Sequence, residues 1–324
     1  MKTALLSKDQ IEKAIPMDAV TQAVEEVYRA HGNDLTIMPP KITLDLSPIG
    51  VEAWTIAMPA YVHPLRAAGI KWVGGYLENP KKGLDYILAM IILQEPETGA
   101  PLAVMDGAHI THIRTGAAAG VCAKYFARPD SRILGVIGAG KQGKTSLRAI
   151  SSLFHLKEAH VYDISPEASA RYAEEMQPAV AVKLVPVSRP KDAVRAADIV
   201  VTATTANEAI VLNEWLKPGV VCVSLGSSQE FDDESIIGAD KVIVDNWEQC
   251  KDRGELARLV SQGRFRREMI HAEMGEVVAG LKPGRSSLSE KIMVVPIGIG
   301  TLDIAVAQLA YQRLKDHCQH FEFF

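Results

Sequence analysis

Apolar residues recur at helical spacing near the N-terminus of the chain. Residues 18–31 are the clearest case, because three valines there fall on one face of a helix: Val20, Val24 and Val27. Upstream, Ser7 and Gln10 have the spacing of a capping box, in which each side chain satisfies a backbone N–H near the start of a helix. The pattern therefore predicts two consecutive helices, of which the first is short.

Between residues 41 and 104 the period of the pattern changes to two. Short runs with β-branched and aromatic residues are separated by turn signals, and they cover residues 41–45, 54–58, 69–73, 86–93 and 101–105. Adjacent runs joined by such short connections pair in antiparallel fashion. This region is predicted to form an antiparallel sheet.

From residue 132 onward, strand and helix signals alternate. Strands are predicted at residues 132–138, 159–163, 181–186, 198–204, 219–225, 241–245 and 292–295, and helices at 110–126, 255–260, 267–278 and 301–315. Alternating strands and helices build a parallel, doubly wound sheet. The predicted fold class is therefore α/β, and the last helix is expected to return to the first domain.

Length and composition restrict the class of protein. A chain of 324 residues with 48% hydrophobic residues can form two domains, each with its own core. The net charge of −4 gives no electrostatic reason to bind nucleic acid or a membrane surface. The most apolar run, residues 87–93, is too short to span a bilayer, and residues 1–8 lack the apolar run of a signal peptide.

The four cysteines are scattered along the chain. They form no C-x-x-C pair, and the nine histidines form no H-E-x-x-H pattern. We therefore expect a reduced, cytoplasmic protein with buried thiols and no metal site.

A glycine motif connects the first strand of the parallel region to the next helix. Residues 133–143 read ILGVIGAGKQG, so Gly138, Gly140 and Gly143 have the G-x-G-x-x-G spacing. Gly138 permits a tight turn, Gly140 leaves room for a pyrophosphate beside backbone N–H groups, and Gly143 lets the helix pack close to the strand. A glycine-rich turn without a ligand is the alternative, but the strand–turn–helix context favours a dinucleotide site.

Asp163 follows the motif at the tip of the next predicted strand. A carboxylate there accepts hydrogen bonds from a ribose 2′-OH and repels a 2′-phosphate, which favours NAD over NADP. Further cofactor contacts are expected from Lys141, Gln142, Thr204, Leu225 and Gly226. Thr204 is also compatible with an ordinary hydroxyl at the end of a strand.

Motifs along nearly the whole chain resemble those of one known family. They lie at residues 38–41, 69–73, 79–84, 96–99, 103–106, 114–117, 138–143, 275–280 and 284–285. Together they resemble the ornithine cyclodeaminase/mu-crystallin family, which also includes alanine dehydrogenases of the archaeal type and reductases of ketimines and pyrroline carboxylates. The motifs are specific to the family and not to one activity within it.

The resemblance implies a division of the chain into two domains. Residues 119–299 would form an NAD-binding Rossmann domain, to which Thr115 adds a cofactor contact. Both chain ends, residues 1–118 and 300–324, would form an α+β domain that binds the substrate and pairs with its twin in a homodimer. The substrate would be a small amino or imino acid.

Three cations are candidates for holding the substrate carboxylate. Lys71 lies in the apolar strand 69–73, where it either snorkels at a sheet edge or is placed for function. The resemblance implies that Lys71 contacts the substrate and takes part in proton transfer, and burial would lower its pKa. It also implies a carboxylate contact from Arg114 and a weaker one from Lys41, for which a surface arginine and a strand-edge lysine are the alternatives.

The loop after the fifth parallel strand departs from part of the family. Cyclodeaminases and alanine dehydrogenases carry an aspartate there as acid or base, whereas this chain has Ser228, as ketimine reductases of the mu-crystallin type do. A serine hydroxyl can hydrogen-bond a substrate but does not ionise at neutral pH. Glu230, Asp232 or Asp233 could replace the missing carboxylate, although each is better interpreted as a solvated charge or a helix cap.

These features predict an NAD-dependent oxidoreductase that transfers a hydride at Cα of a small α-amino or α-imino acid. Lys71, Arg114 and Ser228 are the expected catalytic residues, and Trp54, Met58 and Trp72 are candidate pocket walls that also suit a core. One alternative is an ornithine cyclodeaminase that forms proline and ammonia, which Ser228 disfavours. The other is a binding protein that holds a nucleotide without turnover, which the paired cations disfavour.

Overall fold

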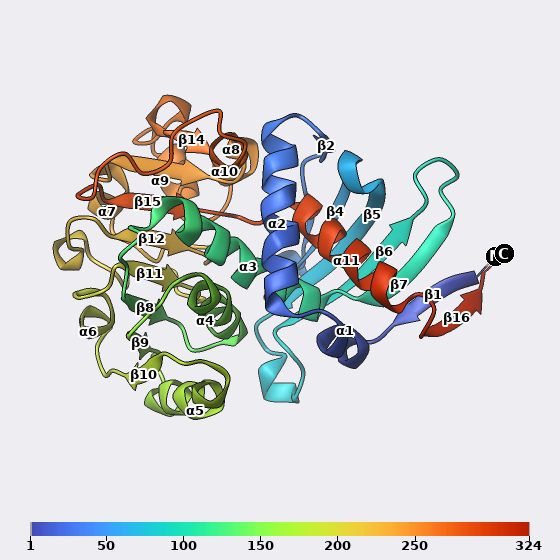
Figure 1. The fold of residues 1–324 in the computed structure, drawn as a ribbon, viewed down its shortest axis with the longest axis horizontal. Helices are drawn as coiled ribbons and strands as arrows, with labels where there is room; N and C mark the ends of the chain where they lie inside the picture. The colour runs from blue at the N-terminus through green and yellow to red at the C-terminus, as the bar shows by residue number, and fades with distance from the viewer. Residues whose placement is uncertain (1, 324) are drawn as a thin grey trace. The chain divides into compact units, whose positions relative to one another are not determined.

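The computed structural model describes residues 2–323, which divide into two compact units. Unit 1 extends to Arg114 and resumes at Ile299, and unit 2 is Thr115–Gly298. Helix α3 (Ala108–Phe126) begins in unit 1 and continues into unit 2. Figure 1 shows the blue, cyan and red elements of unit 1 and the green to orange elements of unit 2.

Unit 1 is built on a largely antiparallel sheet. Its order is β16-β1-β7-β6-β5-β4-β2, and β3 also pairs with β4. The strands are β1 (Lys2–Leu6), β2 (Thr36–Ile37), β3 (Ile42–Asp45), β4 (Ala53–Val62), β5 (Ala67–Tyr76), β6 (Ile87–Gln94), β7 (Pro101–Asp106) and β16 (Gln319–Glu322). The predicted antiparallel pairing is confirmed for β4 to β7, whereas β1, which the pattern did not predict, runs parallel to β7.

The helices of unit 1 follow from the sequence pattern. Ser7 and Gln10 form the predicted capping box at the start of α1 (Lys8–Ala14). In α2 (Met17–Gly32) the three predicted valines are buried. The C-terminal helix α11 (Gly300–Leu314) lies against α2, β4 and β5 (Figure 1). Both ends of the chain therefore contribute to one layer over the sheet.

The register of the sheet assigns residues to its two faces. Met58, Lys71 and Ile91 lie side by side on β4, β5 and β6, and all three are buried. In the next row Trp72 and Met90 are paired, and they are 53% and 54% exposed. Because successive strand residues point to opposite faces, Trp72 points away from Lys71. Trp72 therefore lies neither beside Lys71 nor in the core, which was the alternative for this residue.

Unit 2 contains a parallel sheet in the order β10-β9-β8-β11-β12-β15-β13-β14. Its strands are β8 (Ile133–Ile137), β9 (Glu158–Tyr162), β10 (Lys183–Pro186), β11 (Ile199–Thr202), β12 (Val221–Ser224), β13 (Lys241–Val244), β14 (Ala272–Glu273) and β15 (Ile292–Val295). The predicted doubly wound order is confirmed, because the chain moves outward from β8 to β10 and then returns to the other side of β8 at β11. That reversal places the carboxyl ends of β8 and β11 side by side.

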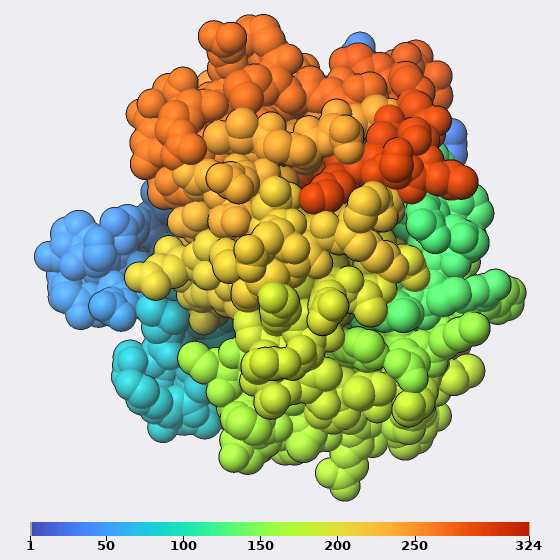
Figure 2. Space-filling view, turned by 90° about the vertical axis from the view of Figure 1, so that its left-hand side faces the viewer, coloured from blue at the N-terminus to red at the C-terminus, as the bar shows by residue number. Residues whose placement is uncertain are grey.

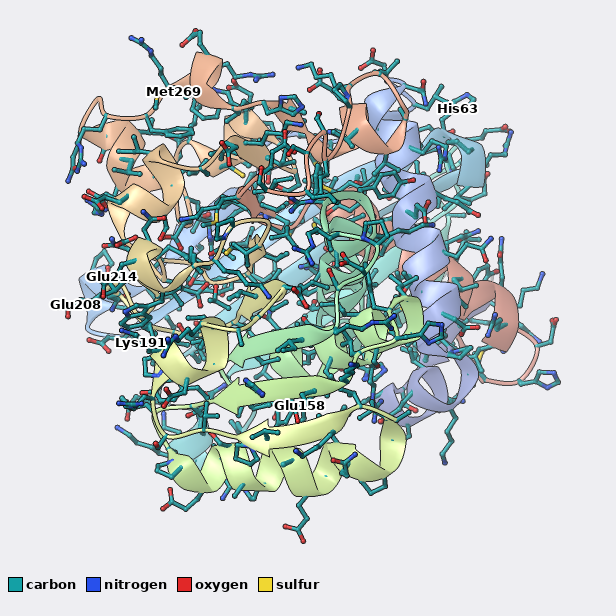
Figure 3. The ribbon with its side chains drawn as sticks, turned by 60° about the vertical axis from the view of Figure 1, so that its left-hand side comes forward. His63, Glu158, Lys191, Glu208, Glu214 and Met269 are labelled. Carbon is teal, nitrogen blue, oxygen red and sulfur yellow. The ribbon has the colours of Figure 1, made fainter. Side chains whose placement is uncertain are left out.

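The helices of unit 2 are α4 (Lys141–Leu153), α5 (Pro166–Met176), α6 (Pro190–Val194), α7 (Asp233–Ile237), α8 (Trp247–Cys250), α9 (Ala257–Ser261) and α10 (Met274–Val278). The predicted helix 267–278 is wrong in its first half, where β14 interrupts it. There Ile270, Ala272 and Met274 are all buried, which is the period of a strand. Figure 2 shows the surface that these segments form together, and Figure 3 shows the side chains of Lys191, Glu208 and Glu214 extending from it.

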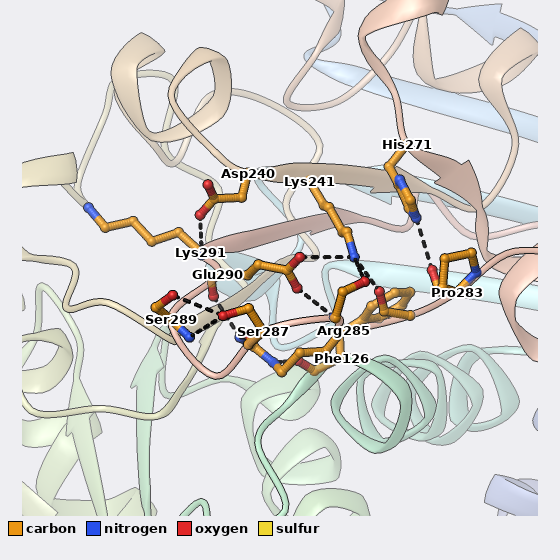
Figure 4. Close-up of polar contacts among 12 residues, drawn as sticks. Phe126, Asp240, Lys241, His271, Pro283, Arg285, Ser287, Ser289, Glu290 and Lys291 are labelled. Carbon is orange, nitrogen blue, oxygen red and sulfur yellow. Dashed lines mark hydrogen bonds and ion pairs between the residues drawn. The ribbon is translucent and has the colours of Figure 1, made fainter.

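Two cations fix the loop that leads into β15. Lys241 donates to the carbonyl of Gly284 at 2.6 Å and pairs with Glu290 at 3.1 Å (Figure 4). Arg285 donates from Nε to the carbonyl of Phe126 at 2.7 Å. Phe126 ends α3, so this contact satisfies a carbonyl that has no partner within the helix.

No helix in the described part of the chain is long and apolar enough to cross a membrane.

Candidate functional site

Lys71 and Arg114, two of the predicted site residues, meet on one buried carboxylate in unit 1. Lys71 Nζ lies 2.8 Å from Oδ2 of Asp303, and Arg114 Nε lies 2.9 Å from Oδ1 of the same side chain. The two cations come from β5 and α3, and Asp303 comes from the first turn of α11. All three residues are buried, so their charges interact in a medium of low polarity.

The surroundings of Lys71 lower the pKa of its ammonium to about 7. Burial is the main cause, and the positive charges of Arg114 and Lys41 act in the same direction. The negative charge of Asp303 opposes them. A lysine with this pKa exists in both protonation states near neutral pH, so it can donate or accept a proton.

The pKa of Asp303 is also lowered, but for a different reason. Burial acts to raise the pKa of its carboxyl, but the charges of Arg114 and Lys71 outweigh that effect and hold the pKa below its usual range. Asp303 is therefore an anion in the folded protein. It keeps the two cations close together, where they would otherwise repel each other.

Thr111 and Lys41 complete the surroundings of Lys71. The Thr111 hydroxyl donates to the carbonyl of Gly107 at 2.7 Å, which leaves its oxygen to accept from Lys71 Nζ at 3.4 Å. Lys41 is half-buried before β3, close enough for its charge to act on Lys71. The structure therefore brings the three predicted cations into one neighbourhood within unit 1.

Sequence reasoning missed Asp303. The residue occupies an apolar helical stretch, residues 300–307, in which every side chain is buried. A lone carboxylate in such a stretch requires a cationic partner, because an unpaired buried charge is very costly. That signal was present in the sequence, but nothing in the sequence named the partner.

In unit 2 the glycine motif has the conformation that dinucleotide binding requires. Gly138 has φ of +103°, and a Cβ there would lie 2.5 Å from the carbonyl oxygen of Ala203. A Cβ on Gly143 would lie 2.3 Å from the carbonyl oxygen of Gly138. A Cβ on Gly140 would meet no atom within 4 Å. Backbone carbonyl groups of the protein therefore crowd Gly138 and Gly143, whereas the space at Gly140 is open. This space lies beside the N-terminus of α4, where a pyrophosphate would bind.

Asp163 lies at the carboxyl end of β9, beside the glycine motif. Its Oδ2 accepts the N–H of Ala139 at 2.8 Å, and its Oδ1 accepts the N–H of Ser165 at 3.0 Å. These bonds fix the carboxylate against the motif. Each carboxylate oxygen retains a second lone pair that a ribose hydroxyl can use.

The acidic side chains of the loop after β12 are not all solvated charges or helix caps, as was predicted from the sequence. Glu230 is fully buried, so its interpretation as a solvated loop charge is wrong. Its carboxylate accepts the N–H of Thr204 at 2.7 Å and the N–H of Gly226 at 3.0 Å, so it joins the ends of β11 and β12. Asp232 caps α7 as predicted, and Asp233 pairs with Arg258 and Arg264.

The remaining predicted site residues all belong to unit 2. Ser228 is half-buried in the loop after β12, together with Leu225 and Gly226. Thr115 is buried in α3, while Lys141 and Gln142 begin α4. Among residues 2–323, no group of three histidine, cysteine or acidic side chains is arranged to hold a metal ion.

Comparisons with known proteins agree with this geometry. The model of the ornithine cyclodeaminase/mu-crystallin family matches residues 1–317. An alanine dehydrogenase of Archaeoglobus fulgidus is 37% identical over 319 residues, which cover 96% of this chain and 95% of the relative.

Two solved structures share the whole fold. The Δ1-pyrroline-2-carboxylate reductase of Thermococcus litoralis, in complex with NADH and L-proline, matches with a TM-score of 0.94 and 35% identity, covering 99% of this chain and 100% of that one. An archaeal alanine dehydrogenase dimer with bound NAD matches with a TM-score of 0.93 and 36% identity, covering 100% of both chains.

Proposed function

The chain belongs to the ornithine cyclodeaminase/mu-crystallin family, and on that premise we propose that it is an NAD-dependent oxidoreductase of small α-amino and α-imino acids. The reaction is hydride transfer at Cα, in the manner of an alanine dehydrogenase or an imine reductase. The observation that carries the proposal is the junction of Lys71 and Arg114 on Asp303. It concentrates positive charge beside a lysine that changes protonation state near neutral pH.

In this proposal unit 2 holds NAD. The backbone N–H groups at the start of α4 bind the pyrophosphate, with Gly138, Gly140 and Gly143 leaving room for it. Asp163 binds the adenosine ribose, and its negative charge selects against a 2′-phosphate. Lys141, Gln142, Thr204, Leu225, Gly226 and Thr115 supply the remaining contacts. When bound, the nicotinamide supplies the hydride acceptor or donor.

Unit 1 binds the substrate carboxylate. Arg114 and Lys71 hold it, with Lys41 as a third cation. Asp303 balances one positive charge, which leaves a net positive site for one incoming carboxylate. Lys71 then donates a proton to the substrate nitrogen, or accepts one from it, according to the direction of the reaction. Ser228 hydrogen-bonds the substrate without ionising.

We also propose a homodimer that forms through unit 1. On the sheet face away from Lys71, a set of large apolar side chains is exposed, comprising Ile42, Leu44, Trp72, Leu88, Met90 and Ile92. A contiguous apolar surface of this kind is typical of a subunit interface. A cytoplasmic location is consistent with four cysteines that form no disulfide within the described residues.

A substrate screen tests the proposed reaction. NADH oxidation would be followed with 2-oxo acids plus ammonia, with cyclic imines such as Δ1-pyrroline-2-carboxylate, and with NADPH in place of NADH. We expect turnover with NADH, and a loss of at least about 100-fold in Lys71→Ala, since that variant removes both the carboxylate contact and the proton donor.

Lys82→Ala is the matched control, because Lys82 is an exposed lysine of the same unit. It should retain full activity. Proline formation from ornithine without added reductant, or tight NADH binding with no turnover on any compound, would contradict the proposed reaction.

A further inference from the structure

Two glutamates that the proposed reaction does not use are buried beneath the loop after β12. Glu230 and Glu255 are 0% and 2% exposed. Glu230 accepts hydrogen bonds from the hydroxyl of Thr202 at 2.5 Å and from the N–H groups of Thr204 and Gly226. Glu255 accepts the N–H groups of Glu230 at 2.9 Å and of Phe231 at 3.1 Å. Together they fix both ends of the loop 225–231.

Ser224 lies between the two carboxyl groups. Its Oγ is 3.0 Å from Oε2 of Glu230 and 3.0 Å from Oε2 of Glu255. A serine hydroxyl carries one hydrogen, so it donates to one of these oxygens only. The second contact is a hydrogen bond only if a carboxyl group carries a proton and donates it to the serine oxygen. With both glutamates ionised, an oxygen of one of them would face the lone pairs of Ser224.

The donors around each carboxyl group identify the protonated one. Apart from Ser224, Glu230 accepts from a hydroxyl and two N–H groups, and Glu255 accepts from two N–H groups. The carboxyl group with more donors is the better anion. We propose that Glu255 carries a proton in the folded protein. Its O–H donates a hydrogen bond to Ser224, and the hydroxyl of Ser224 donates one to ionised Glu230, so that the proton on Glu255 completes the chain of hydrogen bonds that holds the loop 225–231 in place.

The charged groups nearby support this assignment. The ionisable group facing Glu255 from the loop after β12 is Glu230, and β12 itself contributes only the hydroxyl of Ser224. On its own segment, Arg253 precedes Glu255 and Arg258 follows it, with Arg258 paired to Asp233. Ile297, which is apolar, packs against Gly254, the residue before Glu255. The N–H of Ile297 donates to the carboxylate of Asp245. Burial raises the pKa of both carboxyl groups, and that of Glu255, which the charge of Glu230 raises further, is about 7, so it is the number of donors that decides which group keeps the proton.

The proton matters because of the residues that the loop carries. Leu225, Gly226 and Ser228 lie on it, and the backbone of Thr204 is tied to Glu230. In the proposed function, on which this step rests, these residues contact NAD and the substrate. Loss of the proton places two carboxylates on either side of Ser224, and their repulsion displaces the loop. Glu230, Ser224 and Glu255 are therefore positioning residues.

The first test uses the wild-type protein and needs no activity. Infrared spectra of protein labelled with ¹³C at the glutamate carboxyl carbon would be recorded between about pH 5.5 and about pH 8.5. We expect the C=O band of a protonated, buried carboxyl group, which disappears with a midpoint near pH 7. A spectrum in which every glutamate is ionised at about pH 6 would overturn the proposal.

The second test measures NADH binding by fluorescence in three variants. In Glu255→Gln the side chain cannot ionise, so NADH affinity should stay constant from about pH 6 to about pH 8.5. An amide that donates to Ser224 no longer accepts the N–H of Glu230, so this affinity should be somewhat below that of the wild type at about pH 6. The wild type should lose about tenfold in affinity over that range, the equivalent of one pKa unit of coupling. Ser224→Ala should bind weakly at every pH, since the link between the carboxyl groups is gone.

Glu208→Gln is the matched control, because Glu208 is exposed and its side chain extends from the surface of the same unit (Figure 3). It should reproduce the pH dependence of the wild type. If Glu255→Gln shows that same dependence, the proposal is wrong. If no form binds NADH at any pH, the proposed cofactor is wrong, and the infrared band, which should be absent from Glu255→Gln, still decides whether Glu255 holds a proton.

Discussion

At the scale of single residues, the balance of buried charge explains the candidate site in unit 1. Two cations converge on Asp303, and the pKa of Lys71 falls to about 7 because burial outweighs the attraction of that anion. An incoming substrate carboxylate adds a second negative charge, which raises the pKa of Lys71 and draws a proton onto it. Substrate binding and protonation of Lys71 are therefore linked.

Replacing Asp303 by Asn tests this balance. The change leaves two buried cations without their anion, so we expect a loss of about 3–5 kcal/mol in the free energy of unfolding at neutral pH. The pKa of Lys71 should fall below about 7, because the group that raises it is removed. Chemical denaturation and ¹³C NMR titration of labelled lysine would measure the two effects.

The pH dependence of this loss has a defined sign. The folded pKa of Lys71 is depressed, so between that pKa and the value of about 10 in the unfolded chain the unfolded state binds more protons, and stability rises with pH. In Asp303→Asn the rise begins at a lower pH, and the loss of stability should be larger near pH 6 than near pH 9. Asp316→Asn, an exposed aspartate just beyond the same helix, is the control. An equal loss at both pH values would contradict the account.

At the scale of elements, the contact between β8 and α4 determines the shape of the glycine motif. Gly143 places α4 directly on the backbone of the motif, where a Cβ would overlap the carbonyl of Gly138. Gly140 has an ordinary φ of −80° and open space around it. The two glycines are therefore required for different reasons, the first for folding and the second for binding.

Alanine at each position separates these reasons. Gly143→Ala should lower the stability of unit 2 by about 2–3 kcal/mol, because a backbone carbonyl cannot move aside without displacing α4. Gly140→Ala should leave thermal unfolding close to that of the wild type and still weaken NADH binding by at least about tenfold, because the methyl group occupies the space for the pyrophosphate. Calorimetry with NADH titration would distinguish them. Equal behaviour of the two variants would show that the motif is purely structural.

Elements with a local signal were predictable from the sequence. The valine stripe of α2, the capping box of α1 and the glycine motif each need only neighbouring residues, and the structure confirms them. The sequence predicts helix at β14 because the alternation there covers few residues. It does not predict β1 and β16, which pair with each other from opposite ends of the chain and so have no neighbouring partner strand to indicate them.

Pairing across long sequence distances was not predictable. Arg114 and Asp303 are 189 residues apart in sequence, and Glu230 is buried only because Thr202, Ser224 and Glu255 converge on it. No local pattern distinguishes such a buried glutamate from a solvated one.

At the scale of the whole molecule, the sheet of unit 1 has one face in contact with α11 and another face that exposes large apolar side chains. Met90 and Trp72 are paired across β6 and β5, and Ile42 extends the surface on β3. More than half of each of these side chains is exposed. Exposure of so much apolar surface favours association, and a two-fold dimer covers the same surface on both partners.

A charge on this face tests the proposed homodimer. Met90→Glu would bury a carboxylate without a cation in the interface, so we expect it to convert a dimer into a monomer at micromolar concentration, as measured by light scattering after size-exclusion chromatography. Leu281→Glu is the matched control, because Leu281 is 62% exposed on unit 2 and the change is equally large. It should remain a dimer.

The same variant separates assembly from cofactor binding. The glycine motif and Asp163 belong to unit 2, whereas Met90 belongs to unit 1, so monomeric Met90→Glu should bind NADH with about the affinity of the wild type. Its thermal unfolding temperature should become independent of protein concentration, while that of the dimeric wild type rises with concentration by mass action. A wild type that is monomeric at micromolar concentration, or a Met90→Glu variant that remains dimeric, would exclude this face as the subunit interface.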